Sequence, residues 1–159
     1  MKEHLLERTQ IIPASREKVF AFFSDPRNLE MITPPWLHFK ILTHPLPQGA
    51  GSIFDYTLRV RGIPIRWRTL IEEFVPDDFF IDRQIRGPYQ LWHHTHTFKS
   101  LPDGSTEMKD RVRYVIGWGI LGTLAHHFWV QNDLRAIFDY RYRIIENYFK
   151  DQASSAAKK

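Results

Sequence analysis

The sequence predicts an α+β fold of the helix-grip type, in which a curved antiparallel sheet of about seven strands wraps around a long C-terminal helix. Strand-like segments separated by turns fill the middle of the chain, and two short helical segments follow the first strand. The last part of the chain changes to a helical spacing of apolar residues. A terminal helix covers the concave face of such a sheet, and an incomplete fit between them leaves a cavity.

The first strand is predicted at residues 3–12, followed by a helix for which Ser15 is a suitable N-cap. Asp25-Pro26 ends this helix, and a short second helix is predicted at about 26–31. The apolar face of the first helix comprises Val19, Phe20, Phe22 and Phe23.

Further strands are predicted to follow one another as a meander, because Pro-, Gly- and Asp-rich turns separate the apolar runs. They are Trp36–Thr43, Ile53–Val60, Ile63–Val75, Phe79–Arg86, Gln90–Lys99 and Thr106–Ile116.

A two-residue turn at Gly62-Ile63, closed by Arg61 and Pro64, is predicted to join two of these strands into a hairpin. One face of the hairpin is then apolar, and arginines occupy the other. The cross-strand pairs in this register are Val60 with Ile65, Leu58 with Trp67, and Tyr56 with Thr69.

A long amphipathic helix is predicted from Ile120 to Lys150, with Arg135 and Gln131 interrupting its apolar stripe. Residues 1–150 are therefore expected to form one domain, and the small polar residues 151–159 a disordered tail. The stripe comprises Leu121, Leu124, Phe128, Phe138, Tyr142, Ile145 and Phe149.

The composition excludes several classes of protein. With no cysteine, the 159-residue chain has no disulfide, thiolate nucleophile or cysteine metal site. Residues 1–10 lack the apolar run of a secretory signal, and no segment approaches the roughly 20 apolar residues of a membrane span, so a cytoplasmic protein is expected. The net charge of +4 bears more on solubility than on a nucleic-acid partner. An aromatic content of 14% suits a core or a cavity wall.

Three segments resemble a known family: Arg86–Phe98 (RGPYQLWHHTHTF), Asp110–Tyr114 (DRVRY) and Leu121–His126 (LGTLAH). They are similar to a bacterial branch of the START-like SRPBCC superfamily, which is Bet v 1-like and whose members are often described as cyclase/dehydrase-like or ligand-binding. The resemblance covers residues 3–148. It implies a helix-grip fold and a cavity for a hydrophobic ligand, and it assigns no catalytic residue.

The histidine-rich strand is the sharpest candidate site. Strand alternation puts His94 and His96 on one face, and Asp110 on the facing side of the next strand lies opposite one of them. A carboxylate beside a histidine fixes its tautomer and raises its basicity, which gives a candidate general base for proton abstraction, dehydration or aldol-type cyclisation. The structural alternative is a satisfied polar cluster that fixes the hairpin register.

Metal binding is a further alternative for this strand. His94 and His96 with Asp110 offer ligands of the type zinc accepts, and His126 or His127 on the long helix are possible additions. His-x-His on a strand is nevertheless a weak signal, so no metal or other cofactor is expected.

Aromatic residues predicted to face inward are candidates for ligand contact or plain core packing. Arg135, on the dry side of the helix, could bind a ligand carboxylate, pair with Asp110 or Asp82, or extend to the helix edge. Together with His94, His96, Asp110 and Arg135, the ligand-binding candidates are Trp36, Tyr56, Trp67, Trp92, Tyr114 and Phe128.

A set of arginines alternates along the strands as a solvated sheet face should, with Glu72, Glu73 or Glu107 as expected partners. This basic face is also a candidate surface for an acidic partner, but it lacks interleaved aromatics for nucleic acid, and no phosphate loop or nucleophile elbow occurs. Its members are Arg59, Arg61, Arg66, Arg68, Arg111 and Arg113.

These observations favour a protein that binds a hydrophobic small molecule, of the lipid, polyketide-like or isoprenoid class, in an internal cavity. The first alternative is a cyclase or dehydratase that uses a His–Asp acid–base pair. The second is an interaction module that uses the basic sheet face.

Overall fold

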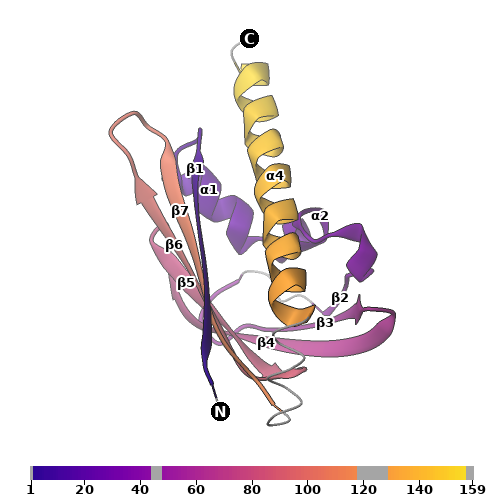
Figure 1. The fold of residues 1–159 in the computed structure, drawn as a ribbon. Helices are drawn as coiled ribbons and strands as arrows, with labels where there is room; N and C mark the ends of the chain where they lie inside the picture. The colour runs from indigo at the N-terminus through magenta and orange to yellow at the C-terminus, as the bar shows by residue number, and fades with distance from the viewer. Residues whose placement is uncertain (1, 44–47, 118–128, 157–159) are drawn as a thin grey trace.

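The computed structural model describes residues 2–43, 48–117 and 129–156. A seven-stranded antiparallel sheet, with strand order β1-β7-β6-β5-β4-β3-β2, curves around helix α4, which confirms the predicted helix-grip fold (Figure 1). In chain order the elements are β1 His4–Ile12, α1 Arg16–Ser24, the 3-10 turn η1 Pro26–Asn28, α2 Leu29–Ile32, the 3-10 turn η2 Pro35–Leu37, β2 Lys40–Thr43, β3 Ile53–Val60, β4 Ile63–Val75, β5 Phe79–Arg86, β6 Tyr89–Ser100, β7 Thr106–Ile116 and α4 Gln131–Ala156.

The first strand closes one side of the sheet by pairing with the last one, so that Leu6 lies opposite Val112. Both residues are buried in a cluster with Leu134 and Phe138 of α4. A larger core cluster joins the buried face of α1 to the sheet and to the C-terminal half of α4. Helices α1 and α4 thus both pack on the concave face of the sheet.

Helix α4 buries a stripe of residues at the spacing that the sequence predicts. Phe138, Ile145 and Phe149 are buried as expected, but Tyr142 is 39% exposed, and Arg141 occupies the inner position instead. The helix continues to Ala156, beyond the predicted end at Lys150, so residues 151–156 are helical and not a disordered tail. Among the described residues, no helix is both long and apolar enough to span a membrane.

Part of the predicted long helix falls on residues that the structure does not describe. The predicted start at Ile120 and the stripe residues Leu121, Leu124 and Phe128 lie outside the described residues, as do His126 and His127.

The strand predicted from Trp36 begins only at Lys40. Pro35 starts a 3-10 turn, in which Leu37 and His38 donate backbone N–H groups to the carbonyls of Pro34 and Pro35. His38 then adopts a left-handed backbone with φ 45°, which ends the turn and redirects the chain. The prolines therefore override the strand-like composition of the segment.

The β3–β4 hairpin turns at Arg61-Gly62 and not at Gly62-Ile63. Arg61 (φ 51°) and Gly62 (φ 82°) both have positive φ, as in a type I′ turn, whose twist matches that of the flanking strands. The predicted register is therefore wrong by two residues, although a two-residue shift leaves every side chain on its predicted face. The observed pairs are Val60 with Ile63, Leu58 with Ile65, and Tyr56 with Trp67.

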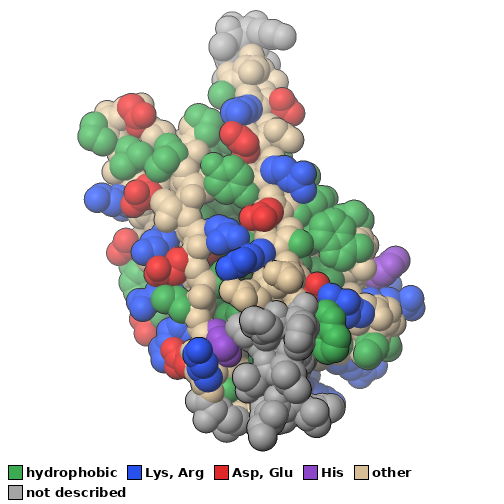
Figure 2. All heavy atoms as spheres, in the orientation of Figure 1, with side chains coloured by type: hydrophobic (Ala, Val, Ile, Leu, Met, Phe, Trp, Pro, Cys, Tyr) green, Lys and Arg blue, Asp and Glu red, His purple; other side chains and the backbone are tan. Residues whose placement is uncertain are grey.

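Several of the basic-face arginines are paired within the molecule. Arg68 contacts Asp55 at 2.7 Å and Arg113 contacts Glu3 at 2.7 Å, while Arg61 reaches Asp133 of α4 at 3.0 Å. These partners differ from the glutamates that the sequence suggested. On the face drawn in Figure 2, acidic side chains lie among the basic ones along the β1 side of the sheet.

Phe98 tests the core because it is 2% exposed and its ring lies 5.3 Å from that of Phe20. We expect Phe98→Ala to lower the free energy of unfolding by about 3–5 kcal/mol, since it leaves a cavity between α1 and β6. Ile63→Ala, at a residue 66% exposed, should cost less than about 1 kcal/mol. Equal losses in chemical denaturation would contradict the assignment of the core.

Candidate functional site

A cavity of about 210 Å³ lies between the concave face of the sheet and α4. Most of its wall is aromatic or aliphatic, and Tyr56, Trp67 and Trp92 stand together on one side. The rings of Tyr56 and Trp67 are stacked at 5.8 Å, and Trp92 meets Trp67 edge to face at 5.3 Å. Such a wall favours a ligand that is apolar over most of its surface.

The polar side chains of the wall include Asp82, His94, His96 and Arg141. Strand pairing brings the two histidines next to two carboxylates. Asp82 on β5 lies opposite His94 on β6, and Asp110 on β7 lies opposite His96. The two histidines alternate onto the concave face of β6 and are thus flanked by a carboxylate from each neighbouring strand.

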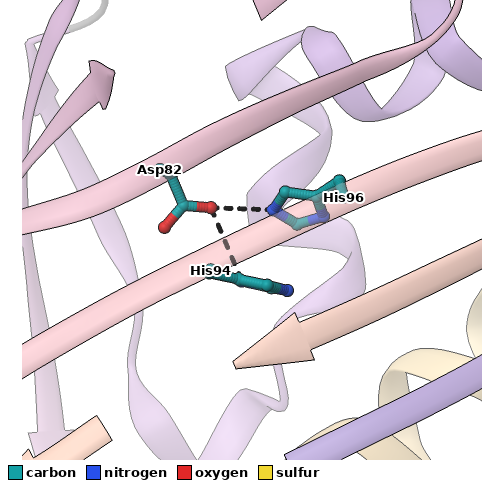
Figure 3. Close-up of side chains that lie close together, drawn as sticks. All are labelled: Asp82, His94 and His96. Carbon is teal, nitrogen blue, oxygen red and sulfur yellow. Dashed lines mark hydrogen bonds and ion pairs between the residues drawn. The ribbon is translucent and has the colours of Figure 1, made fainter. Parts of the chain in front are cut away.

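The distances show that each imidazole lies between the two carboxylates. The His94 Nε2 to Asp110 Oδ1 distance is 2.8 Å, and His94 Nδ1 lies 3.5 Å from Asp82 Oδ2. His96 Nε2 is hydrogen-bonded to Asp82 Oδ2 at 2.7 Å (Figure 3). His96 Nδ1 lies 2.9 Å from Asp110 Oδ1 but without the alignment of a hydrogen bond. We call these four residues the Asp–His cluster.

Three members of the Asp–His cluster are buried, with His94, His96 and Asp110 between 2% and 5% exposed, and the Asp82 side chain is 20% exposed. Burial alone would raise the pKa of both carboxyl groups. Arg141 and the two histidines outweigh this effect and hold the pKa of Asp110 well below its ordinary value. For Asp82 the histidines act first and Arg141 adds to them, so its pKa is lowered too.

The two histidines are not equivalent. Burial, followed by the proximity of His96, lowers the pKa of His94 despite the adjacent carboxylates. For His96, burial also acts to lower the pKa, but the contacts with Asp110 and Asp82 prevail and raise it. At neutral pH His94 is thus the histidine that stays neutral and keeps a lone pair, whereas His96 more readily carries a charge.

Arg141 is the cation of the site. It projects from α4 toward the sheet, lines the cavity, and lies over the rings of Phe23 at 5.5 Å and Phe138 at 5.8 Å. Its Nε is buried and has no hydrogen-bond partner among the described residues. Asp110 itself does not line the cavity and instead lies behind the histidines, beside Arg141.

The predicted ligand-binding residues divide into several groups. Tyr56, Trp67, Trp92, His94 and His96 line the cavity, and their contact with a ligand remains a prediction.

Other candidates lie elsewhere. Trp36 does not line the cavity: it is 52% exposed and packs edge to face on Tyr140. Tyr114 is buried behind Tyr89 and Trp92, and Arg135 is exposed on α4, so neither lines the cavity. Phe128 lies outside the described residues.

Sequence reasoning undervalued Asp82 and missed Arg141. Asp82 follows the buried Phe80 by two residues on β5, and this alternation places both on the concave face. Arg141 lies three residues after Phe138 and four before Ile145, which is the spacing of the buried stripe. The predicted stripe passes through the neighbouring Tyr142 instead, because a tyrosine fits an apolar face better than an arginine.

The curved sheet, the long helix and the cavity between them define a helix-grip protein with a polar cluster in a mostly apolar cavity wall. Residues 12–155 match the family described as polyketide cyclase / dehydrase and lipid transport, and the chain belongs to this family. The predicted membership of the START-like SRPBCC group is thereby confirmed. No curated protein matches the chain.

Solved structures share the fold at low sequence identity. The di-domain aromatase/cyclase StfQ from the steffimycin biosynthetic pathway superposes with a TM-score of 0.75 at 14% identity, over 96% of this chain and 52% of that one. Zhui aromatase/cyclase from Streptomyces sp. gives 0.68 at 14% identity, over 96% of each chain. A START superfamily protein from Mycobacterium smegmatis gives 0.64 at 13% identity, over 94% of this chain and 99% of that one. These likenesses establish the fold.

Asp110→Asn tests the electrostatics of the Asp–His cluster. We expect a loss of about 2–4 kcal/mol of unfolding free energy at pH 7, because Arg141 and His96 lose a buried anionic partner. The folded pKa of Asp110 lies below the unfolded value of about 3.9, so its contribution is full above that value and is lost as the pH falls through the folded pKa.

The difference in unfolding free energy between Asp110→Asn and the unsubstituted protein should therefore become smaller below about pH 4. Denaturant titrations at about pH 7, 5 and 3, which lie on both sides of the unfolded pKa of about 3.9, would measure this difference, with a chelator present. Asp139→Asn is the control, since that side chain is 64% exposed. If this difference is the same at every pH, Asp110 is not ionised in the folded protein.

Proposed function

We propose that this protein binds a hydrophobic small molecule in the cavity, with the polar end of the ligand against Asp82, His94, His96 and Arg141. The observation that carries the proposal is the contrast within one wall, which is apolar over most of its area and, among the described residues, charged only at this patch. Buried polar groups that lack partners favour a ligand that supplies them. Arg141 Nε and Trp67 Nε1 are both buried and without hydrogen-bond partners among the described residues.

The volume of the cavity limits the size of the ligand. About 210 Å³ exceeds the ~150 Å³ chamber that holds benzene and falls below the ~300 Å³ typical of drug-sized ligands. This favours a compact molecule of one or two rings, or a short isoprenoid, over a long acyl chain. The positive Arg141 at the patch favours a carboxylate, phenolate or enolate oxygen at the polar end.

A cyclase or dehydratase is the second candidate, favoured by the 2.8 Å contact between His94 and Asp110. Asp110 accepts a hydrogen bond from the Nε2–H group of His94, which leaves Nδ1 as the basic nitrogen of a histidine that lines the cavity. Such a base can take a proton from the carbon beside a carbonyl, and Arg141 can stabilise the resulting enolate. The family description covers both cyclisation and lipid transport, so it is consistent with either candidate.

Filling the cavity tests the binding proposal. Leu58 lines the cavity on β3, and Leu58→Trp adds a ring where a ligand would lie. We expect the unsubstituted protein to bind about one equivalent of the two-ring fluorescent probe 2-naphthoate, and Leu58→Trp to weaken binding by at least about tenfold. Leu42→Trp, at a residue 48% exposed, is the matched control.

Native mass spectrometry of gently purified protein is the companion measurement, since a cavity ligand can survive purification and be released on denaturation. The proposal would be contradicted if the protein retained no organic molecule and showed no saturable probe binding. Equal binding by the Leu58→Trp and Leu42→Trp variants would place the probe outside the cavity.

His94→Gln separates the two candidates. A carrier should keep its ligand affinity within a factor of a few, because glutamine retains polarity at the patch. An enzyme should keep that affinity but lose roughly 10²–10⁴-fold in rate, the usual contribution of a general base. The ligand identified by mass spectrometry is incubated with each protein, and conversion is followed by chromatography. Equal conversion by both proteins would remove His94 from any catalytic role.

A further inference from the structure

We propose that Asp82, His94 and His96 form a binding site for a divalent first-row metal ion at the cavity wall, with Asp110 as the carboxylate that orients both histidines. The candidate ligand atoms of the first three residues lie within 4.8 Å of one another and come from adjacent strands. The inference does not depend on the proposed small-molecule binding.

The pairing of nitrogens and oxygens in the cluster carries the proposal. Each imidazole has one ring nitrogen facing Asp82 and the other facing Asp110. A neutral imidazole holds only one N–H, so it can satisfy one of its two carboxylates and presents a lone pair to the other. The lone pair then opposes a carboxylate oxygen unless the ring takes a second proton or a metal ion lies between the two atoms.

One tautomer arrangement resolves the conflict. If His94 and His96 carry their protons on Nε2 and Nδ1, both protonated nitrogens lie near Asp110 Oδ1, at 2.8 and 2.9 Å, and a small rotation of the His96 ring would align the second pair. The two remaining lone pairs, on His94 Nδ1 and His96 Nε2, then face Asp82 Oδ2 on the side of the cavity. Two imidazole lone pairs and one carboxylate oxygen are a donor set that zinc and similar ions accept.

The distances suit an ion at this position. Two ligand atoms on one tetrahedral zinc ion lie about 3.3 Å apart. The separation between Asp82 Oδ2 and His94 Nδ1 is 3.5 Å, whereas that between Asp82 Oδ2 and His96 Nε2 is 2.7 Å. An ion would replace the hydrogen bond of the second pair and widen it by about half an ångström. Figure 3 shows the three side chains turned toward one another.

The surroundings complete the site. Metal-bound histidines usually donate their second N–H to a carboxylate. Asp110, 5% exposed, is hydrogen-bonded to His94 and lies beside the second nitrogen of His96. Two carboxylates against the one guanidinium of Arg141 leave the cluster net negative when both imidazoles are neutral, which attracts a cation. The remaining coordination positions would face the cavity, because all three ligands line it and Asp110 does not.

Direct metal titration tests the proposal. The full chain without a histidine tag is stripped with EDTA, exchanged into chelator-free buffer, and titrated with Zn²⁺ by calorimetry and with Co²⁺ by visible absorption. We expect one equivalent of each ion to bind and a Co²⁺ spectrum typical of nitrogen and oxygen ligands. Asp82→Asn should weaken binding by at least about 100-fold, and Asp110→Asn by about 10–100-fold with the stoichiometry unchanged.

His93→Gln is the matched control, because His93 lies next to His94 on β6 but points to the opposite face, toward Glu72 at 3.4 Å. It should leave the affinity within a factor of two or so, comparable to the scatter between independent sites. Absence of saturable binding to the unsubstituted protein would overturn the proposal, whether or not the variants fold. Binding that survives Asp82→Asn at full strength would do so too, because it would place the ion on surface histidines.

Probe binding by the same EDTA-treated protein distinguishes this proposal from the proposed function. Probe binding without metal binding would refute only the metal site. Metal binding without probe binding would refute only the hydrophobic cavity ligand.

Discussion

The charge balance across three adjacent strands is the constraint on which the candidate site depends. Asp110 on β7 is buried and Asp82 on β5 is partly buried, and both stay ionised because two imidazoles on β6 and the guanidinium of Arg141 lie close to them. An isolated buried carboxylate would cost several kcal/mol or would be neutralised, so no member of the set is independent of the others. The pairing also fixes the register of the sheet, since a one-residue slip of β6 would turn both histidines to the outer face.

This constraint explains where the cavity lies. The core below the Asp–His cluster is closed by Phe20, Phe80 and Phe98, whose rings pack against one another from α1, β5 and β6. On its other side, Trp67 and Trp92 line the cavity together with Leu134 and Phe138 of α4. The Asp–His cluster therefore lies where the closed aromatic core gives way to the cavity, and its polar groups need partners that apolar packing cannot supply.

The fold can be predicted from the sequence more completely than the site. The spacing of apolar residues that marks a strand or helix lies within one segment, whereas the site is formed by residues from different strands. Alternation alone places His94, His96 and Asp110 on one face, and the clear turn at Leu101–Gly104 sets Asp110 against His96. Asp82 reaches the histidines only through the pairing of β5 with β6, in which it lies opposite His94, and this pairing joins two strands rather than following from the pattern of either one. Trp36 was assigned to the wall for its aromaticity, but Pro34 and Pro35 hold it in a turn at the surface. The choice between Arg141 and Tyr142 is a rotation of about 100° on the helix, and polarity favoured the wrong residue.

The inequality of the two histidines limits what chemistry the cavity can support. His96 is hydrogen-bonded to Asp82 and lies against Asp110, so a proton on it is stabilised by both carboxylates. The same proton disfavours a second one on His94, because the two rings lie only 3.8 Å apart. His94 is therefore the member that can accept a proton from a bound molecule, and Asp110 offsets the charge that it gains. Proton transfer and simple binding thus place different demands on the same residues: binding needs only the polarity of His94, whereas transfer needs its lone pair.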